Sequence, residues 1–404
     1  MEPKIRFKGF EGEWKEYSLG EVGSIYSGIG FPECEQGGRS GIPFYKVSDM
    51  NNQGNESIMH SSNNYVSDKQ IQRNHWKICS ETPAIFFAKV GAAVMLNRKR
   101  IVLEPCLCDN NTMMFSLSKD KWSTNFALPL FNNVDFPSLA QVGSLPSFNG
   151  SQVKEIKVKL PKFEEQEMVG KYFTSLDSQI SASTSRLASL KQMKAASLQA
   201  MFPQEGETVP KIRFKGFEGE WKKVSFKDFT FHAGTKNRDN LPLESYSISN
   251  EFGFIPQNEQ FENGGTMTQA DKRMYYIVSP NSFAYNPARI NVGSLGYYEG
   301  KEDVIVSSLY EVFKTDDTIC DKFLLYWFKT NIFQKMIEQF QEGGVRLYFF
   351  YDKMCKCSLK RPSLAEQQAI ASYFTSLDRQ ISLQSLRLEK LKQIKSACLD
   401  KMFV

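Results

Sequence analysis

Apolar residues recur at heptad spacing in two long stretches, one following Pro161 and one following Pro362. The repeating positions are Leu176, Ile180, Leu187, Leu190 and Met201 in the first stretch, and Leu377, Ile381, Leu388, Leu391 and Met402 in the second. A narrow apolar stripe on a long helix is typical of a coiled coil. We therefore predict two helices of about 38 residues that pair with each other in antiparallel orientation. An amphipathic helix packed on its own domain is the alternative.

Polar residues interrupt the stripe at matching places in the two helices. Ser183 corresponds to Gln384, and Lys194 corresponds to Lys395. Polar residues within such a seam lower stability and fix register and orientation. The second helix is also expected to begin with a capping box at 363–366, which reads SLAE.

The segments before the two prolines alternate in the way expected of half-buried strands. Ile156 and Val158 alternate in the first half, and Cys357 and Leu359 in the second. Short β-rich runs at 42–47, 83–90 and 303–314 are separated by Gly, Asn and Asp turns. Mixed α+β domains are the expected result.

Two blocks of sequence occur twice. Residues 3–15 and 210–222 both read PKIRFKGFEGEWK, while 172–181 reads YFTSLDSQIS and 373–382 reads YFTSLDRQIS. Residues 23–153 and 230–354, which lie between the blocks, share almost nothing. The sequence therefore predicts a duplicated, pseudo-two-fold α+β architecture in which the helices join two unlike domains. We expect domains at 1–160 and 206–361, with helical segments at 161–205 and 362–404.

Composition permits a nucleic-acid partner but does not require one, because the net charge is +5 and the pI is about 8.6. The eight cysteines follow no metal-ligand spacing, so we expect free thiols and no metal site. No long apolar run and no secretory signal are found, which favours a cytoplasmic protein that does not enter a membrane.

The chain offers weak signals for catalysis. The YSGIG loop at 26–30 and the Glu13–Lys15 triplet are faintly like a methyltransferase loop and a nuclease motif, and no phosphate-binding loop is found. We interpret Gly28 and Gly30 as turn glycines and expect no catalytic residue. A stand-alone methyltransferase or nuclease, and a scaffold that does not touch DNA, remain as alternatives.

Basic and amide side chains in the two unlike domains are the candidates for contact with DNA. Arginine suits guanine, asparagine suits adenine, and clustered lysines and arginines suit phosphates. The candidates are Lys46, Lys89, Asn97, Arg98, Lys99, Arg100, Lys272, Arg273, Asn286, Arg289, Asn291 and Arg346.

The duplicated blocks resemble the specificity (S) subunit of type I restriction-modification systems. The resemblance rests on PKIRFKGFEGEW, on LPKFEEQEMVGKYFTSLDSQI and RPSLAEQQAIASYFTSLDRQI, and on FAYNPARINVGSLG at 283–296. It implies a non-catalytic subunit whose two target-recognition domains each read one half of a bipartite DNA site. It further implies that the helical spacer binds two methyltransferase subunits, with two restriction subunits completing the complex. S-adenosylmethionine, ATP and Mg would then be held by partner subunits, with no cofactor in this chain.

Overall fold

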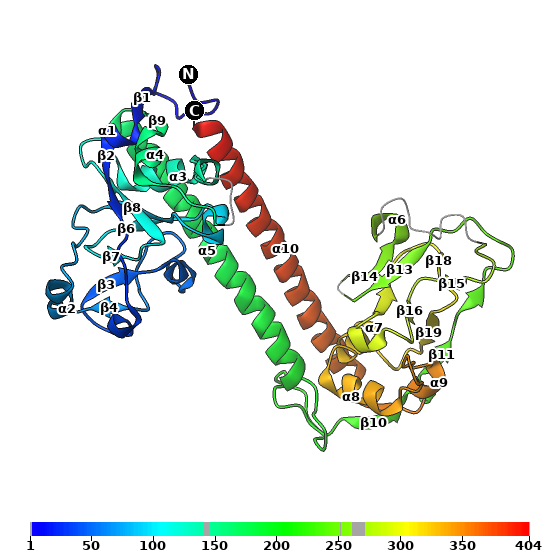
Figure 1. Cartoon of the computed structure of the whole chain (residues 1–404). Helices are drawn as coiled ribbons and strands as arrows, with labels where there is room; N and C mark the ends of the chain where they lie inside the picture. The colour runs from blue at the N-terminus through cyan, green and yellow to red at the C-terminus, as the bar shows by residue number, and fades with distance from the viewer. Residues whose placement is uncertain (1, 141–144, 251, 261–270, 404) are drawn as a thin grey trace. The chain divides into compact units, whose positions relative to one another are not determined.

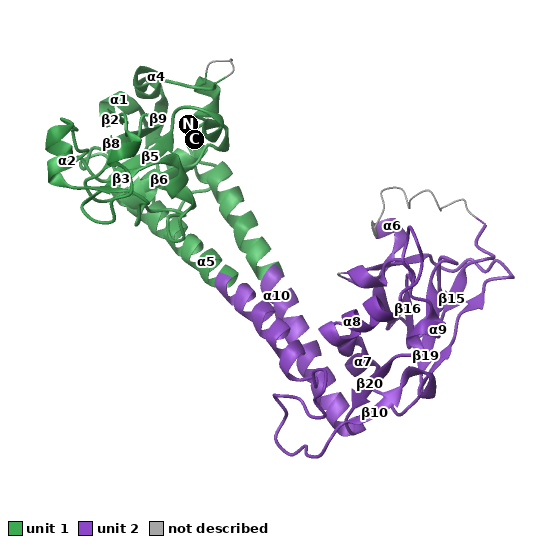
Figure 2. Cartoon of the chain, turned by 60° about the horizontal axis from the view of Figure 1, so that its bottom comes forward, with its two compact units in different colours: residues 1–184, 386–404 green, residues 185–385 purple. Residues whose placement is uncertain are grey.

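A computed structural model describes residues 2–140, 145–250, 252–260 and 271–403. The chain divides into two compact units, coloured separately in Figure 2. Unit 1 comprises Met1–Thr184 and Leu386–Val404, and unit 2 comprises Ser185–Ser385. Each unit therefore contains one globular part and a portion of both long helices. The division into four segments made from the sequence stays a prediction, because it separates the helices from the domains.

Unit 1 is built on a four-stranded sheet in the order β2-β8-β5-β6, with a three-stranded sheet β4-β3-β7 and the pair β1-β9 (Figure 1). The strands are β1 Lys15–Ser18, β2 Gly23–Ser27, β3 Ile42–Tyr45, β4 Tyr65–Val66, β5 Ala84–Ala88, β6 Lys99–Val102, β7 Leu107–Cys108, β8 Thr112–Leu117 and β9 Lys157–Leu160. The helices are α1 Leu19–Val22, α2 Asp68–Arg73, α3 Thr124–Asn133 and α4 Gly150–Glu155, with 3-10 turns η1 Glu33–Glu35, η2 Val47–Asn51, η3 Ala92–Leu96 and η4 Pro137–Leu139.

Unit 2 repeats the four-stranded sheet in the order β11-β19-β16-β17 and adds the sheets β12-β15-β18, β13-β14 and β10-β20. The strands are β10 Lys222–Ser225, β11 Thr230–His232, β12 Thr235–Lys236, β13 Tyr246–Ser249, β14 Gly253–Pro256, β15 Tyr276–Val278, β16 Ser282–Tyr285, β17 Leu295–Tyr298, β18 Val304–Val306, β19 Glu311–Thr315 and β20 Ser358–Arg361. The helices are α6 Gln257–Gln260, α7 Asp321–Trp327, α8 Asn331–Phe340 and α9 Tyr351–Met354, with 3-10 turns η5 Phe226–Asp228 and η7 Ile290–Val292.

The strand that follows each copy of the thirteen-residue repeat pairs with the strand before the long helix. In β1-β9, Lys15 lies opposite Leu160; in β10-β20, Lys222 lies opposite Arg361. Pro161 and Pro362 then end the strands, as predicted. The repeat therefore closes each globular part at the point where the long helix begins.

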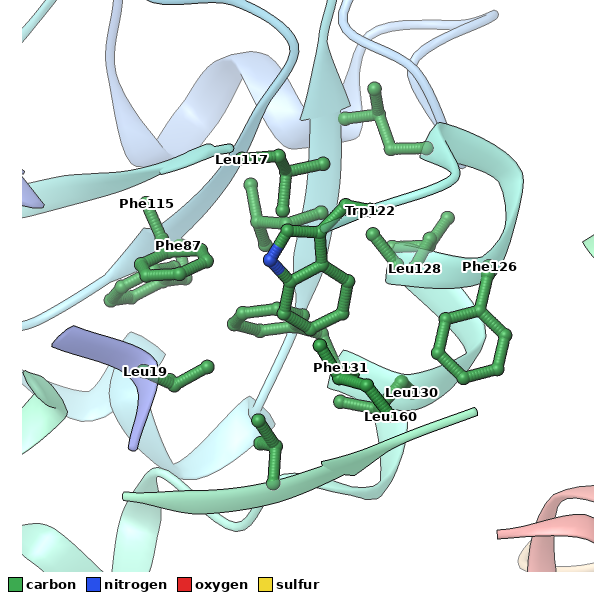
Figure 3. Close-up of a cluster of buried hydrophobic side chains, with 14 of the residues drawn as sticks. Leu19, Phe87, Phe115, Leu117, Trp122, Phe126, Leu128, Leu130, Phe131 and Leu160 are labelled. Carbon is green, nitrogen blue, oxygen red and sulfur yellow. The ribbon is translucent and has the colours of Figure 1, made fainter. Parts of the chain in front are cut away.

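A phenylalanine-rich core fills the space between the four-stranded sheet of unit 1 and its helices (Figure 3). Phe87 and Phe115 come from the sheet, Phe126 and Phe131 come from α3, and Trp122 donates its indole N–H to the Val22 carbonyl at 2.8 Å. The same core includes residues of both long helices, α5 Phe163–Ala200 and α10 Leu364–Met402. Burial of this apolar surface is the main force that holds the helices to the globular part.

The long helices are α5 Phe163–Ala200 and α10 Leu364–Met402, close to the predicted lengths. In unit 1, Tyr172 contacts Cys398, and Asp177 contacts Lys395 at 2.5 Å. Residue numbers increase along α5 while those of the contacting residues decrease along α10, so the two helices run antiparallel. In unit 2, Lys194 contacts Asp378 at 2.5 Å, and the Ser197 and Tyr373 hydroxyls lie 2.9 Å apart. The predicted antiparallel pairing is confirmed within each unit.

Most predicted seam positions are shielded from solvent. Leu176, Leu190, Met201, Leu377, Leu388, Leu391 and Met402 are buried, and Ile180, Leu187 and Ile381 are half-buried. The polar positions Ser183 and Gln384 are buried as well. Lys194 and Lys395 extend to an aspartate on the facing helix, which explains how a lysine is tolerated in the seam.

A buried arginine–glutamate pair ties each thirteen-residue repeat to its long helix. Arg6 donates to the Glu165 carboxylate from two guanidinium nitrogens, at 2.7 and 2.8 Å. Its counterpart Arg213 donates to the Glu366 carboxylate from the same two nitrogens, each at 2.7 Å. The hydrogen bond to Glu165 raises the pKa of Arg6. The predicted capping box at 363–366 forms only in part: Ser363 accepts from the Glu366 N–H at 3.4 Å, but the Glu366 carboxylate goes to Arg213.

Each thirteen-residue repeat contacts both long helices. Its arginine binds the start of one helix, and its backbone bonds to the end of the other. In unit 1 the Ile5 N–H donates to the Lys401 carbonyl at 3.0 Å, at the end of α10. In unit 2 the Ile212 N–H donates to the Ala200 carbonyl at 2.9 Å, at the end of α5. Unit 1 is therefore completed by the last residues of the chain, and unit 2 by the middle of the chain.

We predict that Arg6→Ala and Arg213→Ala each lower the free energy of unfolding by about 2 kcal/mol, because each leaves a buried carboxylate without its partner. The two losses should add, since the pairs share no residue. Urea unfolding would measure them, with Lys8→Ala and Lys215→Ala as exposed controls from the same repeats. Losses as small as those of the controls would contradict the role assigned to the pair.

The helix register can be tested by charge reversal. Asp177→Lys should lower stability by on the order of 1 kcal/mol, because it places two lysines together, and adding Lys395→Asp should restore it. Asp378→Lys should cost more, because Asp378 also accepts from the Tyr326 hydroxyl at 2.9 Å. Thermal unfolding of the single and double variants measures both effects. No recovery in the double variant would argue against this register.

Candidate nucleic-acid interface

The two richest stretches of candidate residues occupy the same place in their units. In unit 1 the β5-β6 connection carries Lys89 and Arg98, and in unit 2 the β16-β17 connection carries Arg289 and Asn291. Both connections contain a 3-10 turn and a residue with left-handed backbone, Asn97 (φ 48°) or Gly293 (φ 90°). Sequence comparison of the two halves did not reveal this equivalence.

A second loop flanks the connection in each unit. In unit 1 the Phe148 N–H donates to the Lys89 carbonyl at 3.2 Å, and in unit 2 the Phe349 N–H donates to the Pro287 carbonyl at 3.0 Å. The loop in unit 2 is a hairpin in which Glu342 and Tyr348 exchange two backbone hydrogen bonds. Its exposed Arg346 is thereby brought to the side of the sheet that carries Arg289.

Three candidates of unit 1 serve the local fold. Asn97 donates to the Val134 carbonyl, and Arg100 donates to the Asn55 and Lys99 carbonyls at 2.5 and 2.8 Å. Lys99 is only 1% exposed; its Nζ donates to the Val134 carbonyl at 2.7 Å and lies 4.9 Å from the centre of the Phe136 ring. Lys99 has no surface to offer to DNA, so we remove it from the candidates.

The other candidates of unit 1 keep polar atoms near the surface. Lys89 donates to the Ser27 hydroxyl at 2.6 Å, Lys46 to the Gln36 side chain at 3.1 Å, and Arg98 to the Asn51 side chain at 2.7 Å. Each is partly exposed and donates to a neutral group. Burial raises the pKa of the Asp109 carboxyl and Lys46 acts to lower it, so Lys89 and Arg98 are the better candidates for binding an anion.

In unit 2, Arg289, Asn291 and Arg346 are exposed. Asn286 accepts from the Ala288 N–H at 3.0 Å and so stabilises the turn. Lys272 and Arg273 precede β15, which belongs to the separate sheet β12-β15-β18, and Arg273 lies 3.7 Å from Asp271. The structure thus brings Arg289, Asn291 and Arg346 to one side of unit 2, and puts Lys272 and Arg273 on another sheet.

Sequence reasoning missed a polar group at the same end of the four-stranded sheet of unit 2. Glu311, the first residue of β19, lies opposite Tyr285, after which the β16-β17 connection begins. Its carboxylate is 3.4 Å from Nε2 of His232, the last residue of β11. Burial raises the pKa of Glu311, and His232 opposes that shift. No motif spacing could reveal the pair, because β11 and β19 are distant in sequence.

The YSGIG loop has a structural explanation. A side chain at Gly28 would place its first carbon 1.7 Å from the Asp109 carbonyl oxygen, so only glycine fits against that backbone. A side chain at Gly30 would instead meet open space, since its first carbon would come within 4 Å of no described atom beyond the adjoining residues. Gly28 is therefore explained by close backbone packing in a turn.

Comparison with known proteins identifies the fold. The family described as the type I restriction modification DNA specificity domain matches residues 11–192 and 219–393, which together make up most of the chain. The chain belongs to this specificity-domain family. Both matches begin within a thirteen-residue repeat, so each specificity domain contains one sheet with its candidate connection.

Two solved structures resemble this specificity protein over nearly its whole length. The S subunit of a type I restriction-modification system from M. genitalium has a TM-score of 0.59 at 12% identity, and the match covers 100% of this chain and 99% of that chain. A protein solved for complex assembly and conformational transition of the type I R-M system has a TM-score of 0.53 at 15% identity, covering 97% and 98%. At these identities the likeness concerns the fold.

Among the described residues of this specificity protein, no helix is both long and apolar enough to cross a bilayer. The long helices α5 and α10 are instead charged outside their seam.

We predict a pH effect that is specific to Lys99. Burial lowers the pKa of Lys99 to about 7 in the folded protein, whereas lysine in an unfolded chain titrates near 10.4. Between these values the unfolded chain holds one more proton, so this group makes the free energy of unfolding rise with pH. Lys99→Met should flatten the rise between pH 7 and pH 10 in urea unfolding. Equal slopes in both proteins would contradict a buried, neutralised lysine.

Proposed function

We propose that this chain is the DNA-specificity subunit of a type I restriction-modification enzyme, and that each unit reads one half of a bipartite DNA target. The observation that carries the proposal is the combination of a repeated framework with unlike connections. The Arg–Glu pair and the antiparallel helix contacts recur in both units. The β5-β6 and β16-β17 connections occupy the same place but present different side chains.

The charge of the candidate residues supports DNA as the ligand. Lys89 and Arg98 in unit 1, and Arg289 and Arg346 in unit 2, could neutralise phosphates or donate to guanine. Asn291 could pair with adenine in the same way. These assignments rest on exposure and chemistry, so they define which residues to test first.

The repeated framework supports two copies of one partner. Identical thirteen-residue repeats, each bound to a long helix in the same way, would offer equivalent surfaces to two methyltransferase subunits. We propose that these subunits hold S-adenosylmethionine, and that two restriction subunits supply the ATP- and Mg-dependent steps in the cytoplasm. The chain itself would then contribute recognition only. The alternatives of a stand-alone enzyme or a scaffold without DNA have no comparable support.

Segment exchange tests the proposal directly. Residues 23–153 would be replaced by the corresponding segment of another family member, and the complex with its methyltransferase subunits would be selected on random duplex DNA. We expect one half of the selected site to change and the other half to persist, because the second unit is untouched.

The complementary exchange of residues 230–354 is the control, and it should change the other half alone. Exchanges that alter both halves, or neither, would contradict one reader per unit. A wild-type complex that selects no bipartite sequence would contradict the proposed function itself.

A further inference from the structure

The two specificity domains differ in charge at corresponding ends of their four-stranded sheets. In unit 1 the side chain that reaches the end of the first strand is a cation, since Lys89 donates to Ser27 at the end of β2. In unit 2 it is a carboxylate, since Glu311 lies 3.4 Å from His232 at the end of β11. Lys89 follows β5 and Glu311 begins β19, so the same end of the sheet carries a cation in unit 1 and a carboxylate in unit 2 from different strands.

Strand register places Glu311 beside the candidate DNA contacts of unit 2. Glu311 is opposite Tyr285 in the β16-β19 pair, and Tyr285 is opposite Leu295 in the β16-β17 pair. The connection that carries Arg289 and Asn291 leaves the sheet between Tyr285 and Leu295. The Arg346 hairpin is bonded to that connection through the Pro287 carbonyl. Glu311 and the three exposed donors thus lie around one end of one sheet.

The Glu311 carboxylate is held in place by its neighbours. His232 contacts it from the adjacent strand, and burial raises the pKa of the carboxyl while both His232 and the backbone of Tyr351 act to lower it. The Tyr351 ring packs against the His232 ring with centroids 5.7 Å apart. The Glu311 side chain remains 20% exposed and that of His232 44% exposed. A fixed acceptor that still reaches the surface is what a hydrogen bond to a base edge requires.

A carboxylate on a DNA-facing surface carries an electrostatic cost, because phosphates repel it. That cost is offset when the carboxylate accepts from an amino group on a base. In the major groove, only cytosine N4 and adenine N6 offer such a donor. Arg289 and Arg346 can supply the positive charge that the phosphates need, which leaves Glu311 free for this role.

We infer, given the proposed function, that Glu311 is a specificity-determining residue of unit 2 that accepts a hydrogen bond from the exocyclic amino group of a cytosine or adenine, with His232 as its positioning residue. Lys89 of unit 1, at the corresponding sheet end, favours an acceptor base instead. The half-sites of the two units therefore differ in hydrogen-bond polarity at the position read from this end of the sheet.

The test uses the complete complex with its methyltransferase subunits, selected on a random duplex library. Wild-type protein and Glu311→Ala, which removes the acceptor altogether, should recover the same half-site for unit 1. In the half-site of unit 2, one position should lose its preference for cytosine or adenine by about fivefold or more, the range expected of a direct base contact. The base preferred by wild type at that position identifies which amino group is read.

Two further variants make the result decisive. Glu299→Ala is the matched control, since Glu299 follows β17 at the opposite end of the sheet and pairs with Lys322; its motif should equal wild type. His232→Gln should weaken the preference at the same position, and it replaces Glu311→Ala if that variant fails to assemble.

Unchanged motifs in Glu311→Ala, or in His232→Gln if the first variant cannot be assembled, would overturn the inference. Loss of the unit 1 half-site as well would also overturn it, because the effect would then be structural. Absence of any bipartite motif in wild type would instead contradict the proposed function.

Discussion

The antiparallel packing of α5 and α10 is the interaction on which the rest of the structure depends. Within each unit, the first part of one helix lies against the last part of the other, and the apolar seam joins the phenylalanine core of the globular part. Specific polar contacts then fix the register, through Asp177 with Lys395 in unit 1 and Asp378 with Lys194 in unit 2. Hydrophobic burial supplies most of the stability, and these pairs select one arrangement among several.

The framework could be predicted from the sequence because its signals are local and repeated. Heptad spacing, a proline after each strand and identical blocks all act over a few residues, and Leu176 and Leu377 are buried as expected. The role of Glu366 could not be read in the same way. Its spacing from Ser363 indicates a cap, but a partner distant in sequence, Arg213, offers a stronger bidentate hydrogen bond and takes the carboxylate.

The candidate interface was harder to predict, since it depends on which side chains the fold covers. Lys99 and Arg98 are neighbours in sequence, but Lys99 is the buried first residue of β6, whereas Arg98 precedes the strand and is partly exposed. His232 and Glu311 meet only because β11 and β19 pair. The sequence identified a basic segment around Arg98 and Lys99. The tertiary structure determines which of its side chains stay exposed and can contact DNA.

The hydrogen bond between Ile5 and Lys401 has a consequence for biosynthesis. Unit 2 is a single continuous stretch of chain, so a ribosome delivers all of it before it reaches residue 386. Unit 1 needs residues 386–403, which follow unit 2 in the chain, to cover Phe173 and Leu176. Unit 1 is therefore translated first but completes its fold after unit 2. Until then its apolar helix face is exposed in the nascent chain, where chaperones act.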